Sequence, residues 1–299
     1  MSVADAIRAA AEQLGETSDT ARLDAELLMA HALDAARSDM LLRHMRDPAP
    51  DTFAALVERR AKHEPVAYIT GFQEFYGRAF HVTPDTLIPR GDSETLIEAA
   101  LEQAPGASRV LDLGTGTGAL LLTFLAETQA LGIGIDRSPA AIEIATKNVQ
   151  RLGMTDRAEL RAADWTTAGW AESIGQFDLI LCNPPYVEEN AELEPDVHDF
   201  EPASALFAGP KGLDDYRILF PQLGKLLSPE GVAIFEIGAS QGIQVSEIAN
   251  KSGFSAQLRH DLAGRPRALI CISARAQGSP KIGMINDRGL AKPFRLDRP

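Results

Sequence analysis

The sequence predicts an α/β fold in which a mostly parallel sheet of seven strands follows a small N-terminal helical bundle. Two observations lead to this prediction. Residues 1 to about 70 place apolar residues at helical spacing and give no strand signal. From residue 110 onward, short apolar runs alternate with helical segments, which is typical of a parallel sheet covered by helices. With 299 residues, the chain can form one large or two modest domains.

The N-terminal region is predicted to fold into several short amphipathic helices. Residues 3–14 repeat apolar side chains at helical spacing, and Gly15 ends the run. Further helices are expected from Asp19 or Thr20 and behind a cap at Asp51. Short helices of this kind pack as a bundle, because each has one apolar face to bury.

The segment after the bundle has a different pattern. Aromatic and polar residues alternate from Phe72 to Phe80 around Gly77, which predicts a short hairpin. Phe75 in this hairpin is a candidate to cover a ligand, although such a residue is more often part of a core. We therefore divide the chain into a helical domain at 1–70, a hairpin linker at 71–91, a sheet domain at 92–275 and a flexible C-terminal tail at 276–299.

The seven strands are predicted from short apolar runs separated by turns or helical segments. They are expected at residues 110–113, 131–135, 158–162, 177–182, 231–237, 256–259 and 268–272. The last two runs are joined by a short connection, so they should pair antiparallel. Residues 187–215 form a long acidic connection without a strand signal, and loops of this length are usually functional or mobile.

Composition and charge exclude several classes of protein. The net charge is −13, whereas tight binding to free nucleic acid needs a basic surface, so stable nucleic-acid binding is not expected. The chain has no signal-peptide pattern and no apolar stretch of about 18 residues, so we expect a cytoplasmic protein without a membrane span. Cys182 and Cys271 lie in apolar runs and are interpreted as buried reduced thiols. The histidines show no metal-ligand spacing, and no metal site is predicted.

A glycine-rich turn follows the first predicted strand and leads directly into a helix. Its residues are Gly114, Thr115, Gly116, Thr117 and Gly118. The order of strand, glycine turn and helix is typical of a nucleotide-type site, because glycines let a ligand touch the backbone.

Acidic and aromatic residues at the next strand ends indicate which kind of ligand this site holds. The second strand ends at Asp136, 22 residues after Gly114, where a carboxylate would hold a ribose diol. Asp164 and Trp165 follow the third strand, where a carboxylate and an indole would hold and cover an adenine, or would be a helix cap and a core residue. The Lys-Ser/Thr pair of a P-loop is missing, so the sequence favours an adenosine-type cofactor.

The fourth predicted strand runs straight into Asn183, Pro184, Pro185 and Tyr186. Two prolines end the strand and stiffen the turn, and the turn lies where open α/β sheets bind ligands. Asn183 offers an amide that both donates and accepts hydrogen bonds. Such a site can hold a planar NH2 group, whose two protons go to two carbonyl oxygens while a ring covers its face.

Together these motifs resemble the class I S-adenosylmethionine-dependent methyltransferases, and more specifically the release-factor glutamine methyltransferases of the HemK or PrmC family. The resemblance extends from about Glu64 to Ile272. It also rests on Leu87-Ile88-Pro89-Arg90, Phe200-Glu201-Pro202 and Glu236-Ile237-Gly238. Gly91 departs from the family pattern, which usually has a second proline after the arginine.

The resemblance implies a Rossmann-like methyltransferase sheet, S-adenosyl-L-methionine as cofactor, and class I peptide chain release factors as partners. It implies catalytic roles for Asn183, Pro184 and Tyr186, and a substrate site formed by these residues with Pro185 and Phe75. It implies cofactor binding by Gly114 to Gly118, Asp136, Asp164, Trp165 and Asn183, and partner binding by residues 1–70. A glutamine methyltransferase of a ribosomal protein, a nucleic-acid amino methyltransferase and a non-enzymatic adenosine-binding module remain as alternatives.

Overall fold

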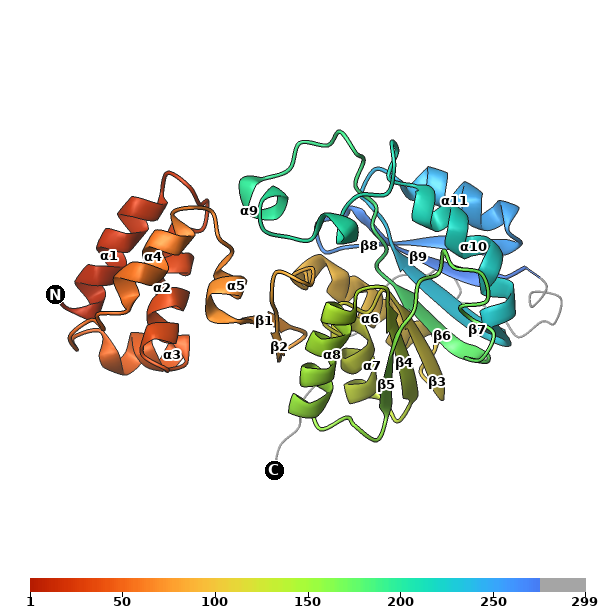
Figure 1. Ribbon diagram of the computed structural model, residues 1–299, viewed down its shortest axis with the longest axis horizontal. Coiled ribbons are helices and arrows are strands. Elements are labelled where there is room, and N and C mark those ends of the chain that lie inside the picture. Colours follow the sequence, from red (N-terminus) through yellow and green to blue (C-terminus); the bar gives the residue numbers. More distant parts are fainter. Residues whose placement is uncertain (275–299) are drawn as a thin grey trace, which may run out of the picture.

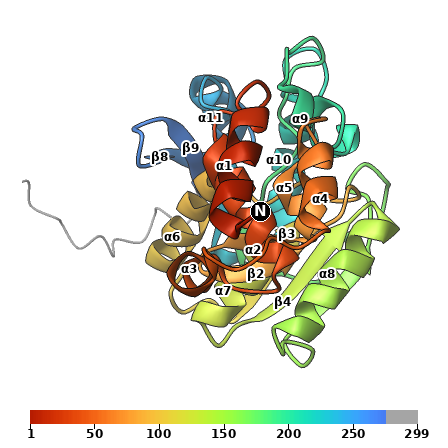
Figure 2. The same cartoon turned by 90° about the vertical axis from the view of Figure 1, so that its left-hand side faces the viewer.

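The computed structural model describes residues 1–274, in which an N-terminal group of helices lies beside a sheet domain (Figure 1). The predicted tail at 276–299 lies outside the described residues. The helices of the N-terminal part are α1 (Val3–Leu14), α2 (Ala21–Ala32), α3 (Arg37–Asp39), the π-helical turn η1 (Met40–His44), α4 (Phe53–Arg60) and α5 (Val66–Thr70). Viewed from the N-terminal side, they lie in front of the sheet domain (Figure 2).

The bundle has its own apolar core. Ile7 and Leu14 of α1 pack with Leu28 and Met29 of α2, and all four side chains are fully buried. The start of α1 is capped by Ser2, whose hydroxyl accepts a hydrogen bond from the backbone N–H of Asp5. The predicted third helix begins one residue later than expected, with Thr52 instead of Asp51 at its cap.

The helix α5 connects the bundle to the next segment, because its side chains enter two cores. Ile69 packs into the bundle, whereas Tyr68 packs with Val82 and Ile88 of the linker. The predicted hairpin is present as β1 (Phe72–Phe75) and β2 (Arg78–His81), which pair antiparallel.

The sheet domain contains seven strands in the order β5-β4-β3-β6-β7-β9-β8. The strands are β3 (Arg109–Leu113), β4 (Leu131–Asp136), β5 (Ala158–Ala162), β6 (Phe177–Cys182), β7 (Leu227–Glu236), β8 (Phe254–His260) and β9 (Pro266–Ser273). All pairs are parallel except those of β9, which runs antiparallel to β7 and β8; the antiparallel pairing of β8 and β9 was predicted. The strand β7 begins four residues earlier than expected, because Leu227 pairs with Phe177 before a shift in register.

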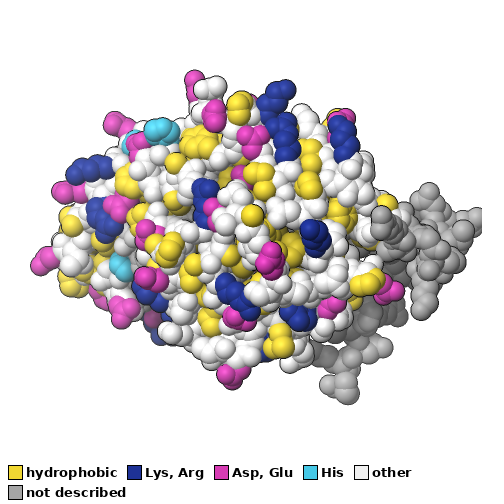
Figure 3. Space-filling view, turned by 45° about the vertical axis from the view of Figure 1, so that its right-hand side comes forward, with side chains coloured by type: hydrophobic (Ala, Val, Ile, Leu, Met, Phe, Trp, Pro, Cys, Tyr) yellow, Lys and Arg dark blue, Asp and Glu magenta, His cyan; other side chains and the backbone are white. Residues whose placement is uncertain are grey.

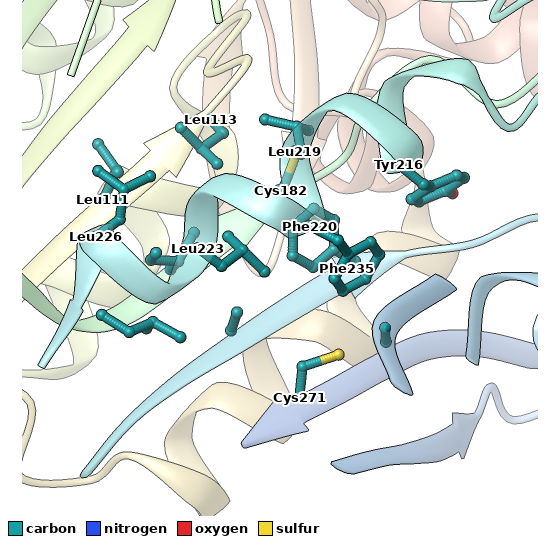
Figure 4. Close-up of a cluster of buried hydrophobic side chains, with 14 of the residues drawn as sticks. Leu111, Leu113, Cys182, Tyr216, Leu219, Phe220, Leu223, Leu226, Phe235 and Cys271 are labelled. Carbon is teal, nitrogen blue, oxygen red and sulfur yellow. The ribbon is translucent and has the colours of Figure 1, made fainter. Parts of the chain in front are cut away.

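Helices cover both faces of this sheet. The longer helices are α6 (Glu94–Gln103), α7 (Ala119–Glu127), α8 (Pro139–Arg151), α10 (Asp214–Leu226) and α11 (Gly242–Lys251). The short 3-10 turn η2 (Gly91–Ser93) leads directly into α6. The helices α6, α7 and α8 pack against one face of the sheet, and α10 and α11 pack against the other. Figure 4 shows the second core, where Phe220 of α10 stacks on Phe235 of β7 with ring centroids 4.8 Å apart. The sheet is therefore the middle layer of three, as a Rossmann-like fold requires.

The long connection between β6 and α10 contains two short helical turns, α9 (Pro195–His198) and η3 (Ala203–Ala205). Within residues 1–274, every helix is too short or too polar to span a bilayer. Cys182 and Cys271 are buried free thiols, as predicted.

Candidate active site

A cleft opens at the carboxyl ends of β3, β4 and β6, and most but not all of the predicted site residues line it. The glycine turn and Asp136 form one wall, and Asn183 with Pro185 forms the other. The roof comes from the linker at 85–90 and the long connection at 202–205. Parallel strands bring these segments together, because their carboxyl ends meet at one edge of the sheet.

The glycine turn is held by backbone hydrogen bonds to the neighbouring strand. The N–H groups of Gly114 and Thr115 both donate to the carbonyl of Ile135, at 2.9 and 2.8 Å. Gly116 has a φ of 53° and lines the cleft, and a Cβ atom added there would meet nothing within 4 Å. The backbone at Gly116 is thus bare toward the cleft, and a side chain would fill space that a ligand can use.

Gly118 has a different role from the other residues of the turn. It does not line the cleft, and it caps α7 with a φ of 82°. Thr117 lines the cleft, and its carbonyl accepts a hydrogen bond from the buried Asn148 side chain at 2.9 Å. The same amide also donates to the carbonyl of His81, so it ties the turn to the hairpin linker.

Asp112 lies beneath the turn and is buried. Its Oδ2 accepts a hydrogen bond from Thr115 Oγ1 at 2.7 Å, whereas its Oδ1 is buried without a partner among the described residues. Burial raises the pKa of Asp112 to about 7, and the hydrogen bond from Thr115 opposes this shift.

Asp136 ends β4 and lines the cleft. Its carboxylate accepts hydrogen bonds from the backbone N–H groups of Gly116 and Ser138, at 3.0 and 2.9 Å. Burial raises the pKa of Asp136, and these two hydrogen bonds act against the rise. Each carboxylate oxygen has a second lone pair, so the group can still accept from a ligand.

Asp164 and Trp165 are placed differently although they are neighbours in sequence. Trp165 lines the cleft, and its ring lies 3.3 Å from where a Cβ atom of Gly114 would stand. Its indole N–H donates to Asp215 Oδ1 at 2.9 Å, which fixes the ring. The Asp164 carboxylate does not line the cleft, and it accepts from the backbone and hydroxyl of Thr166, which lowers its pKa.

The segment Asn183–Tyr186 forms the opposite wall. Asn183 and Pro185 line the cleft, while Pro184 is buried behind them. No hydrogen bond joins the side-chain amide of Asn183 to another described residue, so its donor and acceptor are available to a ligand. Tyr186 does not line this cleft but a hollow beside it that shares Arg90 with the cleft, and its hydroxyl donates to Glu236 Oε1 at 3.1 Å.

Charged and polar contacts hold the two segments of the roof, the linker and the long connection, in place over the cleft. Arg90 forms an ion pair with the buried carboxylate of Glu201, which brings the linker and the long connection together. On the other side, Arg137 donates to the carbonyl of Ser204 at 3.0 Å. Phe75 lines the cleft from the hairpin but is 1% exposed, so it serves the core and the cleft together.

Sequence reasoning gave no role to several residues that shape this site. Arg90, Glu201 and Glu236 lie in motifs on which the family resemblance rests, but the motifs alone do not reveal which side chains meet. The contact between Arg90 and Glu201 joins residues 111 positions apart in the chain. The sequence offered one signal for this contact: in each of two separate loops a charged residue stands next to a proline, as Pro89-Arg90 and as Glu201-Pro202.

Two family models match parts of this chain. The family model described as PrmC N-terminal domain matches residues 5–71, and one described as Methyltransferase domain matches residues 106–259. The catalytic domain of hMettl16, solved with the MAT2A 3′UTR hairpin 6, has a TM-score of 0.53 and 16% identity over 77% of this chain and 94% of that chain. This likeness concerns the fold alone.

Two curated relatives are similar over most of their length, and both are named release factor glutamine methyltransferase. The protein from Cereibacter sphaeroides is 44% identical over 286 residues, which is 92% of this chain and 99% of that protein. The protein from Rhodospirillum rubrum is 40% identical over 269 residues, which is 87% of this chain and 82% of that protein. The chain described here therefore belongs to the release factor glutamine methyltransferase family.

Proposed function

We propose that this protein transfers a methyl group from S-adenosyl-L-methionine to the side-chain amide nitrogen of a glutamine in the Gly-Gly-Gln loop of class I peptide chain release factors. Membership of the family supports the substrate. The observation that supports the chemistry is the free side-chain amide of Asn183, which lines a cleft shared with the glycine turn. The protein would act in the cytoplasm, where release factors work.

The cofactor would lie along the glycine turn. The bare backbone at Gly116 is a cradle of the kind that adenosine cofactors use, and the fixed Trp165 ring offers an apolar surface beside Gly114. The remaining lone pairs of Asp136 suit a ribose diol, while Asp164 would contribute only from the edge of the site. When bound, this cofactor supplies a methyl group on a positively charged sulfur.

The acceptor would be held by Asn183 and Pro184. An amide nitrogen is a poor nucleophile, because its lone pair is delocalised into the carbonyl. Its two protons can donate to the Asn183 side-chain oxygen and the Pro184 carbonyl, which would fix the direction of the nitrogen. Tyr186 would pack against the amide plane, with Phe75 and Pro185 completing the apolar surroundings. Orientation of this kind contributes up to several kcal/mol to a reaction barrier.

A labelling experiment tests the proposal. The protein is incubated with radiolabelled S-adenosylmethionine and a bacterial class I release factor, and the modified residue is located by mass spectrometry. We expect label on the glutamine of the Gly-Gly-Gln loop and none on a matched factor in which that glutamine is alanine. Equal labelling of both factors would refute the assignment.

The same experiment separates the alternative acceptors. A ribosomal protein and a DNA or RNA substrate are added in parallel reactions, and label only on one of these would favour that alternative. The net charge of −13 argues against a nucleic-acid substrate. The surface view in Figure 3 agrees with this argument, since acidic and basic side chains are interspersed there without a continuous basic area.

We propose further that the N-terminal bundle recognises the folded release factor. A truncation should end before α5, because the Tyr68 hydroxyl donates to the carbonyl of Thr86 at 2.7 Å in the linker. Removing residues 1–64 is expected to raise KM for the full-length factor while leaving activity on a short Gly-Gly-Gln peptide almost unchanged. Equal loss on both substrates would contradict a role in recognition.

A further inference from the structure

Glu236 is a buried carboxylate directly behind the Asn183–Tyr186 segment. It ends β7 and is 1% exposed. Cys182 of β6 pairs with Phe235 of β7. The residues that follow them, Asn183 and Glu236, therefore lie side by side at the ends of neighbouring strands. Leu181 and Ile234 belong to the core under α6 and α7, and the alternation along each strand gives Asn183 and Glu236 the same face.

The two oxygens of Glu236 bind two hydroxyl groups from different parts of the chain. Oε2 accepts from Ser93 Oγ at 2.5 Å, and Oε1 accepts from Tyr186 Oη at 3.1 Å. Ser93 lies at the N-terminal end of α6 and also lines the main cleft. The main chain of Glu236 is fixed as well, because the Tyr216 hydroxyl donates to its carbonyl at 2.7 Å.

A second hollow adjoins the main cleft at this point. Tyr186 and Glu236 line it together with Arg90, which lines both spaces. Arg267 also lines the hollow, but its guanidinium pairs with Asp92 at 2.7 Å. Among the described residues, Glu236 therefore accepts side-chain hydrogen bonds only from the two hydroxyls, and Tyr186 lines the hollow directly after Asn183 and Pro185 of the cleft wall.

We infer that Glu236 is a positioning residue for methyl transfer, which acts by fixing the ring of Tyr186 beside the acceptor amide. The inference rests on the proposed function and adds a residue to its acceptor side. A tyrosine ring attached only at its Cα can turn about two bonds, whereas a hydrogen bond at its far end fixes both. Burying a carboxylate is unfavourable unless it is hydrogen-bonded, so this site keeps Glu236 only because both oxygens have donors.

The test measures whether Glu236 acts through Tyr186. Glu236→Ala and Tyr186→Phe are each expected to lower kcat on the release factor by about 10- to 100-fold, since small misplacements of reacting groups have effects of that size. Combining them should lower kcat by no more than about 2-fold beyond either single variant, because both changes remove the same contact. KM and the cofactor Kd from calorimetry should each stay within about 2-fold of the wild type.

Glu236→Gln provides the conservative variant. Its amide oxygen can accept from Tyr186 while its NH2 group donates to Ser93 Oγ, so we expect it to retain most of the kcat that Glu236→Ala loses. If Glu236→Ala does not fold, Glu236→Asp takes its place in the cycle, because its shorter side chain withdraws the carboxylate from the Tyr186 hydroxyl. In that cycle, Glu236→Asp is expected to lower kcat in the wild type and to have no effect once Tyr186 is phenylalanine.

Asp178→Asn is the matched control. Asp178 lies at the opposite end of β6, and its carboxylate also accepts from hydroxyls, those of Ser108 and Ser228. This change should alter stability without altering kcat. Multiplicative losses in the double variants, a cofactor Kd that rises as kcat falls, or a Glu236→Gln variant as impaired as Glu236→Ala would overturn the inference. A wild-type protein inactive on release factors would instead refute the proposed function.

Discussion

The two walls of the cleft differ in what their polar groups already bind. On the glycine-turn wall, the backbone N–H groups of Gly114, Thr115 and Gly116 donate hydrogen bonds within the protein. The Asp136 carboxylate accepts hydrogen bonds from two backbone N–H groups. On the opposite wall, the amide of Asn183 has no such partner among the described residues. One wall is built by internal hydrogen bonds, and the other keeps its hydrogen-bonding capacity for a ligand.

This difference separates stability from activity. A change on the glycine-turn wall removes bonds that hold the fold as well as bonds to a cofactor, so both properties should suffer. A change at Asn183 removes no bond from the folded protein, so it should affect turnover alone. The predictions below follow from this contrast.

The largest effect is expected for Asn183→Ala. Methyl transfer should fall by at least about 100-fold, because the acceptor loses the group that orients it. The free energy of unfolding should stay within about 0.5 kcal/mol of the wild type, as for substitutions without structural partners. Kinetics and urea unfolding on the same preparation measure both. A large loss of stability would show that the two walls do not differ in this way.

Asn183→Asp sharpens this prediction. The variant retains an acceptor but loses the amide donor, and it adds a negative charge beside the methyl donor. We therefore expect impaired turnover in a folded protein. Near-normal turnover would contradict the amide clamp.

A smaller effect is expected for Asp136→Ala. Cofactor affinity should fall by about 1.5–3 kcal/mol, which is typical of hydrogen bonds to a charged group. Stability should fall too, because the N–H groups of Gly116 and Ser138 lose their acceptor. Asp164→Ala is the comparison variant, and its effect on affinity should be smaller because its carboxylate does not line the cleft. Calorimetry on both folded variants measures the two losses of cofactor affinity. Equal losses would contradict a larger role for Asp136 than for Asp164.

The smallest effect on activity is expected at Asp112, which does not line the cleft and instead governs the pH dependence of stability. Its pKa is about 7 in the folded protein and near 4 when unfolded, so the folded state holds the proton more tightly. The wild type should therefore lose stability as the pH rises from about 4 to about 7, a loss that Asp112→Asn cannot undergo. The variant should gain up to about 4 kcal/mol over the wild type across this range, because each unit of pKa difference corresponds to about 1.4 kcal/mol. Urea unfolding at pH 4, 6 and 8 measures this, and a constant difference would contradict it.

The fold could be predicted in detail because its signals are local. Each strand of the sheet is a short apolar run, and the short link containing Gly264 indicated that β8 and β9 are antiparallel. The prediction missed α3, η1 and α5 in the N-terminal part, and the turns α9 and η3 in the long connection. These elements have only three to five residues, too few for a periodic pattern to emerge.

The site was predictable only in part. Glycines and carboxylates at strand ends can be found from the sequence, since parallel strands bring such ends together. Which way a side chain turns cannot be found in this manner. Asp164 turns toward Thr166, and Tyr186 turns toward Glu236, because each finds a hydrogen-bond partner that only the folded chain provides.

The two buried thiols make the sheet domain separately observable. Cys182 directly precedes Asn183 in β6, Cys271 lies in β9, and the chain has no other cysteine. Thiol reagents reach such groups only when the surrounding strands open, so their rate of reaction reports opening of the sheet. The N-terminal bundle contributes no signal to this measurement. The rate of thiol labelling, measured with and without a ligand, can therefore show whether that ligand slows opening of the sheet domain, without any contribution from the bundle.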